Sequence, residues 1–211
     1  MSRRPGRAAR GSAAQRRARR RSFLALFAVV VAALLVGGAL FALITGGRDL
    51  DSEAALVENY PYPVQMFPPD PGGRRHFAQG ETYDSYNSNP PTSGPHTSVA
   101  VGPGVYDEPV PKETAVHNME HGHVVVWYNC GGGSQPLEEA TCGILRQQLA
   151  AIVNEAIQDG ERVLMTPYGE MDHRIALTAW QFLDTFDEFD DQRVRTFIDT
   201  FYCHTDLEGF C

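Results

Sequence analysis

The stretch that decides the fold reads His117-Asn118-Met119-Glu120-His121-Gly122-His123-Val124-Val125-Val126-Trp127-Tyr128. Three of the seven histidines fall within seven residues, beside a carboxylate and a thioether. The apolar run from Val124 to Tyr128 is typical of a buried strand, so the polar groups are expected at the edge of a rigid element. Proteins tend to build functional sites at such edges. The stretch therefore predicts a site, and its histidines indicate a metal site.

Regular structure is expected mainly after residue 111. One or two helical turns over 113–120 should end at Gly122, a suitable residue for a helix C-cap. Hydrophobic periodicity then predicts a strand at 123–128, a helix at 137–158, strands at 162–166 and 174–180, and a last helix with Val194, Phe197, Ile198 and Phe201 on its core face. This β-α-β-β-α order predicts an α+β fold with a single small sheet and its helices on one face.

Charge is distributed unevenly along the 211 residues. Residues 1–48 carry ten arginines and no acidic residue, whereas residues 49–211 carry eight basic residues and all 26 acidic ones. These formal charges of +10 and −18 give the net charge of −8. Between the arginines, residues 23–45 are uncharged and almost wholly apolar. As a helix this segment would be about 33 Å long, enough to cross a hydrocarbon core of about 30 Å, so it is predicted to be a transmembrane helix.

The arginines before this segment determine its expected orientation. By the positive-inside rule, residues 1–22 form a basic cytoplasmic tail and the chain beyond Thr45 is extracytoplasmic. The predicted protein is thus a single-pass protein of the cell membrane, with the lipid bilayer as its partner. A twin-arginine-like export signal at Arg20-Arg21 is the alternative, but the apolar segment exceeds the usual length of a signal core. The acidic ectodomain argues against nucleic-acid binding, and no protein partner can be named.

The extracytoplasmic part divides into a linker and a domain. Residues 46–75 are rich in proline and glycine, which predicts a linker that holds the domain away from the bilayer. Residues 76–211 have an ordinary size for one domain with its own core. Within this domain, residues 83–96 show neither helical nor strand periodicity. They are expected to form a long, proline-rich ordered loop, and such loops are usually functional.

All four cysteines follow the apolar segment, at Cys130, Cys142, Cys203 and Cys211. An extracytoplasmic location favours disulfide bonds. Four cysteines allow three connectivities, and closeness along the chain favours Cys130–Cys142 and Cys203–Cys211. A zinc site built from all four cysteines is the alternative, although the sequence has no Cys-x-x-Cys pair.

Histidine spacing defines the candidate metal ligands. On a helix, His117 and His121 lie four residues apart and share a face, so both imidazoles can reach one metal ion. If the backbone is already extended at His121, then His121 and His123 share a face instead. His96 ends the proline-rich loop and is the third expected ligand. Nitrogen-rich sites of this kind suit zinc or copper.

Other side chains near these histidines have supporting roles in this interpretation. Glu120 is a candidate ligand, orienting group or general base. Met119 and the Met171-Asp172-His173 cluster favour copper slightly, because thioethers prefer Cu(I). His76 and His204 are expected at the surface.

Two other functions are compatible with the same residues. Histidines at loop ends often hydrogen-bond only to the backbone, which would make the domain a non-catalytic interaction module of the cell envelope. Residues 117–121 also match the H-x-x-E-H pattern of inverted zinc peptidases, but Gly122 and the strand leave no room for the long helix required. Ser88 and Ser93 near His96 suggest a Ser-His hydrolase, although no Gly-x-Ser-x-Gly elbow is present. Whether the protein is an enzyme is therefore undecided at this stage.

Three motifs, in this order, are similar to those of a known bacterial family. They are Tyr86–His96, Val116–Gly122, and Asp172 with Ile175–Trp180. Over about residues 75–202 the chain resembles a membrane-anchored extracytoplasmic family catalogued as domain of unknown function 3105. The resemblance implies one membrane anchor and an outward-facing domain, but no activity. The polar motif positions that it implies are His96, His117, Glu120, His121 and Asp172, the last in a supporting role.

Overall fold

The computed structural model describes residues 52–78 and 80–211. The predicted basic tail (1–22) and transmembrane helix (23–45) lie outside the described residues. Within the described ranges, no helix is both long and apolar enough to cross a membrane. The chain divides into two compact units, Met1–Glu58 and Asn59–Cys211. The described part of the first unit, residues 52–58, is helical, and all that follows concerns the second unit.

The second unit is an α+β domain built on a mixed six-stranded sheet with the order β1-β8-β7-β5-β6-β4. Its strands are β1 (Gln65–Met66), β4 (Gly104–Val105), β5 (Val124–Tyr128), β6 (Val163–Pro167), β7 (Ile175–Ala179) and β8 (Phe182–Phe186). The central strand β5 runs parallel to β6 and antiparallel to β7. A separate parallel pair joins β2 (His76–Phe77) to β3 (His96–Thr97), with His76 opposite His96. The predicted stretch therefore forms the centre of the sheet, and β1 lies within the range predicted as linker.

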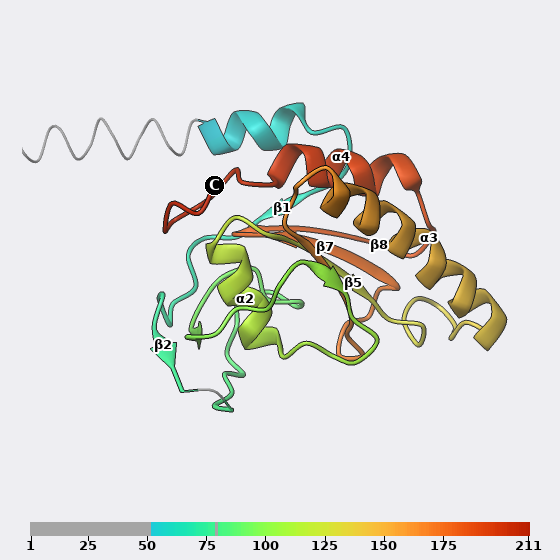
Figure 1. Cartoon of the computed structure of the whole chain (residues 1–211), viewed down its shortest axis with the longest axis horizontal. Coiled ribbons are helices and arrows are strands. Elements are labelled where there is room, and N and C mark those ends of the chain that lie inside the picture. Colours follow the sequence, from blue (N-terminus) through green and yellow to red (C-terminus); the bar gives the residue numbers. More distant parts are fainter. Residues whose placement is uncertain (1–51, 79) are drawn as a thin grey trace, which may run out of the picture. The chain divides into compact units, whose positions relative to one another are not determined.

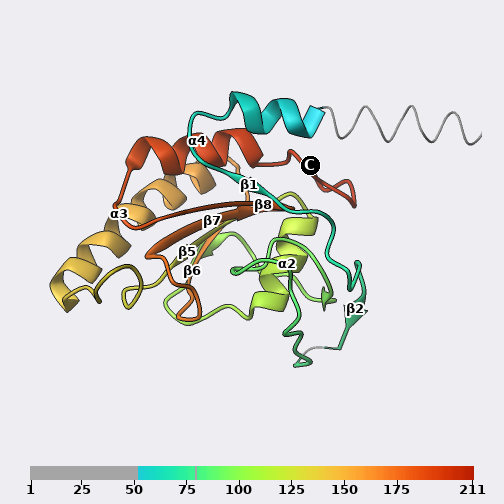
Figure 2. The ribbon, with the colours of Figure 1, turned by 180° about the vertical axis from the view of Figure 1, so that it is seen from behind.

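Helices cover both faces of the main sheet. Figures 1 and 2 show α3 (Glu139–Gln158) and α4 (Asp191–Phe201) on one face, and α2 (Lys112–Glu120) on the other. Every residue of β5 is buried, because successive side chains point to opposite faces and both faces are covered. Val125 and Trp127 belong to the cluster that also contains Met119 of α2.

Two details of the predicted fold are wrong. The first is that all helices lie on one face: α2 lies on the face opposite α3 and α4 (Figure 1). Its buried side chains include several polar ones, so its sequence does not show the apolar periodicity of a core helix. The second is the element order, which lacks β8. Trp180 and Gln181 form a tight turn into β8, with Gln181 at φ 69°, and the buried Asp184 interrupts the apolar pattern of that strand. The single predicted sheet also omits the β2–β3 pair.

Both predicted disulfides are confirmed. Cys130 pairs with Cys142 and thereby joins the end of β5 to α3, whereas Cys203 pairs with Cys211 and closes a C-terminal loop. No cysteine is free in the described part of the chain. The alternative of a four-cysteine zinc site is therefore wrong.

Candidate metal centre

Helix α2 brings His117 and Glu120 to one side of the domain. The two residues lie three apart on the helix and therefore share a face. Eight of the nine residues of α2 are buried, so the rotamers of its side chains are constrained by their neighbours. The helix ends at Glu120 with His121 as its C-cap, and Gly122 follows with φ +78°. A Cβ atom at Gly122 would lie only 2.6 Å from Cys211 Sγ, so glycine permits both the turn and the close approach of the C-terminal loop.

The proline-rich loop brings His96 to the same place. Asp70 organises this loop by accepting hydrogen bonds from the amides of Gly72 at 2.8 Å and Asn87 at 3.0 Å. Tyr86 donates its hydroxyl to the carbonyl oxygen of Pro95 at 2.6 Å. The loop is thus held by its own polar contacts, as expected for an ordered functional loop. It leads into the short strand pair in which His96 lies opposite His76.

Four side chains converge at this position, and we call them the His3Glu cluster: His76, His96, His117 and Glu120. One ligand atom from each lies within 4.8 Å of the others. Within the cluster, Glu120 Oε2 lies 2.9 Å from His96 Nε2 and 3.4 Å from His76 Nε2. Zn–N bonds of about 2.0–2.1 Å would place tetrahedral ligand atoms about 3.3 Å apart. The cluster could therefore close around a zinc ion with small side-chain movements.

The hydrogen bonds of the histidines leave nitrogen lone pairs for a cation. His96 Nδ1 lies 2.7 Å from the carbonyl oxygen of Gly94 and donates its proton there. In the neutral ring, Nε2 is then an acceptor that faces another acceptor, Glu120 Oε2, so a proton or a metal ion must lie between them. Nδ1 of His117 is buried and has no hydrogen-bonding partner among the described residues. Both observations fit a metal ion as the missing partner.

Charges around the cluster favour the protonation states that bind metal. Burial lowers the pKa values of His96 and His117, and neighbouring histidines lower that of His117 further. Burial raises the pKa of Glu120, but hydrogen bonds and charge from Arg74 and His96 outweigh this effect and lower it overall. Arg74 donates its Nε to Glu120 Oε1. These shifts favour the forms that ligate metal ions, which are the neutral imidazoles of His96 and His117 and the carboxylate of Glu120.

The structure places His121 beside the cluster but does not include it. Its Nε2 lies 2.8 Å from Glu208 Oε2, and its ring stacks on Phe210 with centroids 4.1 Å apart. The ring centroids of His121 and His117 are nevertheless only 4.4 Å apart. The two histidines thus share a side of α2 as predicted, but contacts with the C-terminal loop hold the His121 ring.

Four other candidates from the sequence lie outside the cluster. His123 is buried and accepts a hydrogen bond from Asn118 at its Nδ1, 3.1 Å away, and burial, with the charge of Arg162, lowers its pKa to about 4. Met119 is fully buried in the apolar cluster, which removes the support that its thioether gave to copper. Asp172 is exposed in the turn after β6. His173 pairs with Asp187 at 3.3 Å.

Sequence reasoning missed His76 as a member of the cluster. Its side chain is 42% exposed, in agreement with the predicted surface position, yet its Nε2 faces Glu120. Nothing in the local pattern Arg74-Arg75-His76 indicates a site. The signal is long-range, because the parallel pairing of β2 with β3 alone places His76 next to His96.

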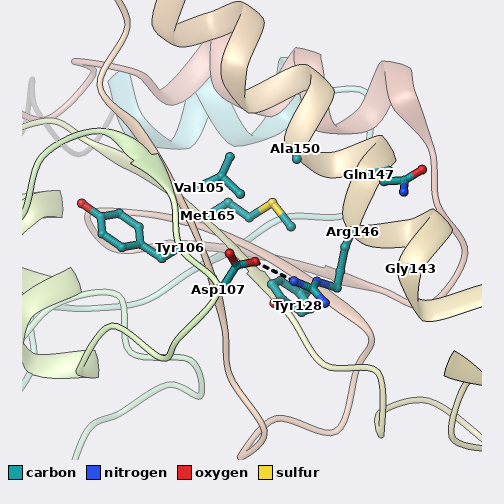
Figure 3. Close-up of a pocket in the computed structure, with 9 residues that line it drawn as sticks. All are labelled: Val105, Tyr106, Asp107, Tyr128, Gly143, Arg146, Gln147, Ala150 and Met165. Atoms are coloured by element: carbon teal, nitrogen blue, oxygen red, sulfur yellow. Dashed lines mark hydrogen bonds and ion pairs between the residues drawn. The ribbon is translucent and has the colours of Figure 1, made fainter.

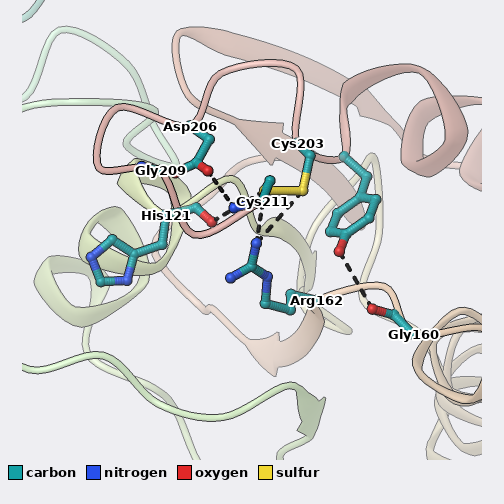
Figure 4. The surroundings of a disulfide bond; sticks show 8 residues. His121, Gly160, Arg162, Cys203, Asp206, Gly209 and Cys211 are labelled. Atoms are coloured by element: carbon teal, nitrogen blue, oxygen red, sulfur yellow. Dashed lines mark hydrogen bonds between the residues drawn. A yellow bond between two sulfur atoms is a disulfide. The ribbon is translucent and has the colours of Figure 1, made fainter.

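The C-terminal loop closes over the end of α2. The amide of Leu207 donates to the carbonyl oxygen of Glu120 at 3.1 Å, and that of Cys203 to Gly122 at 3.0 Å. Figure 4 shows the disulfide of this loop beside the guanidinium of Arg162, which lies 2.7 Å from Cys211 Sγ. The loop therefore satisfies backbone carbonyls that the helix end leaves unpaired.

A cavity of about 300 Å³ lies on the α3 side of the sheet, away from the His3Glu cluster. Arg146 of α3 lines it and pairs with Asp107 at 2.6 Å, above the ring of Tyr128 (Figure 3). The charged groups of this cavity are thus paired with one another. It contains no histidine, unlike the His3Glu cluster.

The fold and the site together define the class of this protein. It is an α+β domain in which three histidines and a glutamate converge on one point. The chain belongs to the family described as protein of unknown function (DUF3105), whose model matches residues 76–208. The match includes all four residues of the His3Glu cluster and confirms the resemblance noted in the sequence. No curated protein and no solved structure matches the chain.

Proposed function

We propose that this domain binds one transition-metal ion through the His3Glu cluster, on the outer side of a membrane to which the chain is tethered. The observation that carries the proposal is the convergence of four ligand atoms within 4.8 Å. Three imidazoles and a carboxylate are typical ligands of zinc. Zinc is preferred to copper here, because Met119 packs in the core instead of facing the cluster.

The two oxygens of Glu120 have separate roles in this proposal. Oε2 faces His96 and His76 and is the metal ligand, whereas Oε1 accepts from Arg74. The carbonyl of Gly94 fixes the ring of His96 through Nδ1. Outer contacts of this kind orient ligands and tune metal affinity. Arg74 and Gly94 are therefore positioning groups for the metal ligands.

A non-hydrolytic role is favoured over a hydrolase. Four protein ligands fill a tetrahedral zinc site, whereas catalytic zinc sites keep one position open for water. The serine alternative also lacks support, because the Ser88 hydroxyl lies 3.1 Å from that of Thr92. Ser93 Oγ has no hydrogen-bonding partner in the described part of the chain. Neither serine is thus bonded to His96.

The membrane tether rests on the sequence. The uncharged segment 23–45 has spanning length, and the arginines before it favour a cytoplasmic N-terminus. The two disulfides support an extracytoplasmic location for the domain, because disulfides persist in oxidising compartments.

Metal analysis of the full chain in mild detergent tests the proposal. After chelator treatment and reconstitution, we expect about one equivalent of bound zinc and a raised melting temperature. His96→Gln and His117→Gln should lose the metal. The matched control is His173→Gln, which changes an exposed histidine outside the cluster. Less than about a tenth of an equivalent of both zinc and copper, with no thermal shift, would overturn the proposal and favour an interaction module with structural histidines.

A further inference from the structure

The four residues of the His3Glu cluster differ sharply in their exposure to solvent. The side chains of His96 and Glu120 are 0% and 1% exposed, and His117 is 7% exposed. The side chain of His76, in contrast, is 42% exposed. Figures 1 and 2 both show its strand, β2, at the periphery of the domain. His76 is thus the cluster residue that solvent reaches most easily.

The four residues also differ in how firmly they are held. The ring of His96 donates to a backbone carbonyl oxygen at 2.7 Å, and Glu120 accepts from Arg74. His117 lies on α2, whose residues are nearly all buried. Among the described residues, the side chain of His76 makes one polar contact, the approach of its Nε2 to Glu120 Oε2 at 3.4 Å. Because outer contacts hold metal ligands in place, His76 is the least constrained of the four.

The backbone around His76 lets its side chain move without disturbing the core. Strand β2 has two residues and belongs to a sheet of two strands, and such pairs contribute little stability of their own. The next residue, Phe77, is buried and anchors the strand. Exposed side chains change rotamer rapidly. The ring of His76 can therefore turn away from the cluster while the other three ligands stay in place.

We propose that His76 is the exchangeable ligand of the cluster, and that the domain passes its zinc to a partner protein. In the first step of this transfer, a histidine side chain of the partner takes the place of His76. One zinc–nitrogen bond forms and one breaks. Both imidazoles are neutral, so no electron or proton is transferred. The inference rests on the proposed function and deepens it, because the zinc becomes a transferred ion instead of a permanent structural one.

The chemistry of the position favours a histidine side chain as the incoming ligand. Glu120 Oε2 lies 3.4 Å from Nε2 of His76, so its charge favours a neutral donor over a carboxylate. Free thiols are rare in the oxidising compartment proposed for the domain. With three ligands kept, a tetrahedral zinc site has one position to fill. A histidine side chain within a protein supplies one nitrogen, whereas free histidine also binds metal through its amino group.

Transfer of zinc from the loaded full chain, in mild detergent, to a chromogenic chelator tests the inference with imidazole as the probe. We expect the rate of transfer to rise in proportion to the imidazole concentration, because imidazole displaces His76. Acetate is the control: it is an anionic donor of similar size and should leave the rate unchanged. A rate that is independent of imidazole, or equal acceleration by acetate, would overturn the inference.

Variants localise the exchange. His76→Ala opens the exposed position, and saturating imidazole should recover at least about tenfold in zinc affinity. His117→Ala opens a buried position that imidazole cannot reach, so the recovery should be less than about twofold. The matched control is His173→Ala, at an exposed histidine outside the cluster, and its zinc affinity should not respond to imidazole. Circular dichroism checks that each variant is folded. No recovery in His76→Ala, or equal recovery in folded His117→Ala, would contradict the assignment.

Zinc uptake separates the failure of this inference from the failure of the proposed function. If the unmodified chain takes up no zinc, both are overturned. If it takes up one equivalent but imidazole neither speeds transfer nor rescues His76→Ala, the proposed function stands with a sealed structural ion. That result would overturn the exchange of His76 alone.

Discussion

The two faces of the main sheet bury different kinds of side chain. On the α3–α4 face, apolar residues such as Leu149 and Phe197 are fully buried. On the α2 face, the buried set includes Glu113, His117 and Glu120 beside the apolar cluster. A buried apolar side chain can pack against many different neighbours, whereas a buried polar group needs a specific hydrogen-bonding or charged partner. The α3–α4 face thus stabilises the fold through apolar packing, whereas the α2 face holds the candidate metal centre.

The largest expected effect is on the apolar face. Phe197→Ala should lower the free energy of unfolding by about 3–5 kcal/mol, because it removes a fully buried aromatic ring. Zinc stoichiometry of the folded fraction should not change. Denaturant unfolding and metal analysis check both points. Ile144→Ala, at an exposed position of α3, should change the free energy by less than about 0.5 kcal/mol. Loss of zinc from folded Phe197→Ala protein would show that the two faces are not separable.

Low pH should lower the free energy of unfolding through His123, which packs against Asn118 of α2. Its pKa is about 4 in the folded chain because the ring is buried, and about 6.5 when unfolded. The unfolded state therefore takes up the proton first, so stability falls as pH drops from about 6.5 to about 4, by about 3 kcal/mol in total.

Urea unfolding at a series of pH values, with chelator present, measures this effect. His123→Gln should have a shallower pH dependence over this interval. An unchanged slope in that variant would assign the acid sensitivity to other groups.

The C-terminal loop offers the next test. Cys203→Ser/Cys211→Ser should lower the free energy of unfolding by about 2–3 kcal/mol, because a short loop is no longer closed in the unfolded chain. Zinc should still bind, because this loop contains none of the cluster residues. The matched control is Cys130→Ser/Cys142→Ser, which opens the other disulfide. Zinc loss only in the Cys203/Cys211 variant would make the loop part of the metal site.

The smallest expected effect sharpens the assignment of ligands. His121→Gln removes a hydrogen bond with Glu208 near the surface, and such exposed polar contacts are worth about 0–1 kcal/mol. The zinc dissociation constant should change by less than about threefold, whereas His117→Gln should raise it by at least about a hundredfold. Competition titrations with a zinc chelator measure both constants. Equal effects of the two substitutions would place His121 among the ligands.

Much of the apolar framework could be predicted from the sequence. The run Val124–Tyr128 identified β5 because uninterrupted apolar residues indicate burial on both faces. The core-facing spacing of Val194 and Phe197 likewise predicted α4. Strand β8 was missed because Asp184, buried and paired with Arg193 at 2.9 Å, interrupts its pattern. A charge inside a strand is not a local signal of burial.

The site could be predicted only in part. His96, His117 and Glu120 were identified because they lie at the ends of motifs that flank regular elements. His76 was not, because its position depends on a pairing with His96 twenty residues away along the chain. His121 was expected as a ligand from helical spacing, but the C-terminal loop supplies Glu208 and Phe210 as its contacts. Tertiary contacts of this kind do not appear in local periodicity.

X-ray absorption spectroscopy of the zinc-loaded full chain tests the central claim most directly. The account predicts three imidazole nitrogens and one carboxylate oxygen at about 2.0–2.2 Å from zinc, and loss of one imidazole in His76→Gln. His76→Gln is the sharpest variant, because its sequence context gives no hint of a ligand. A shell with one or two imidazoles, or a spectrum that His76→Gln leaves unchanged, would contradict the account.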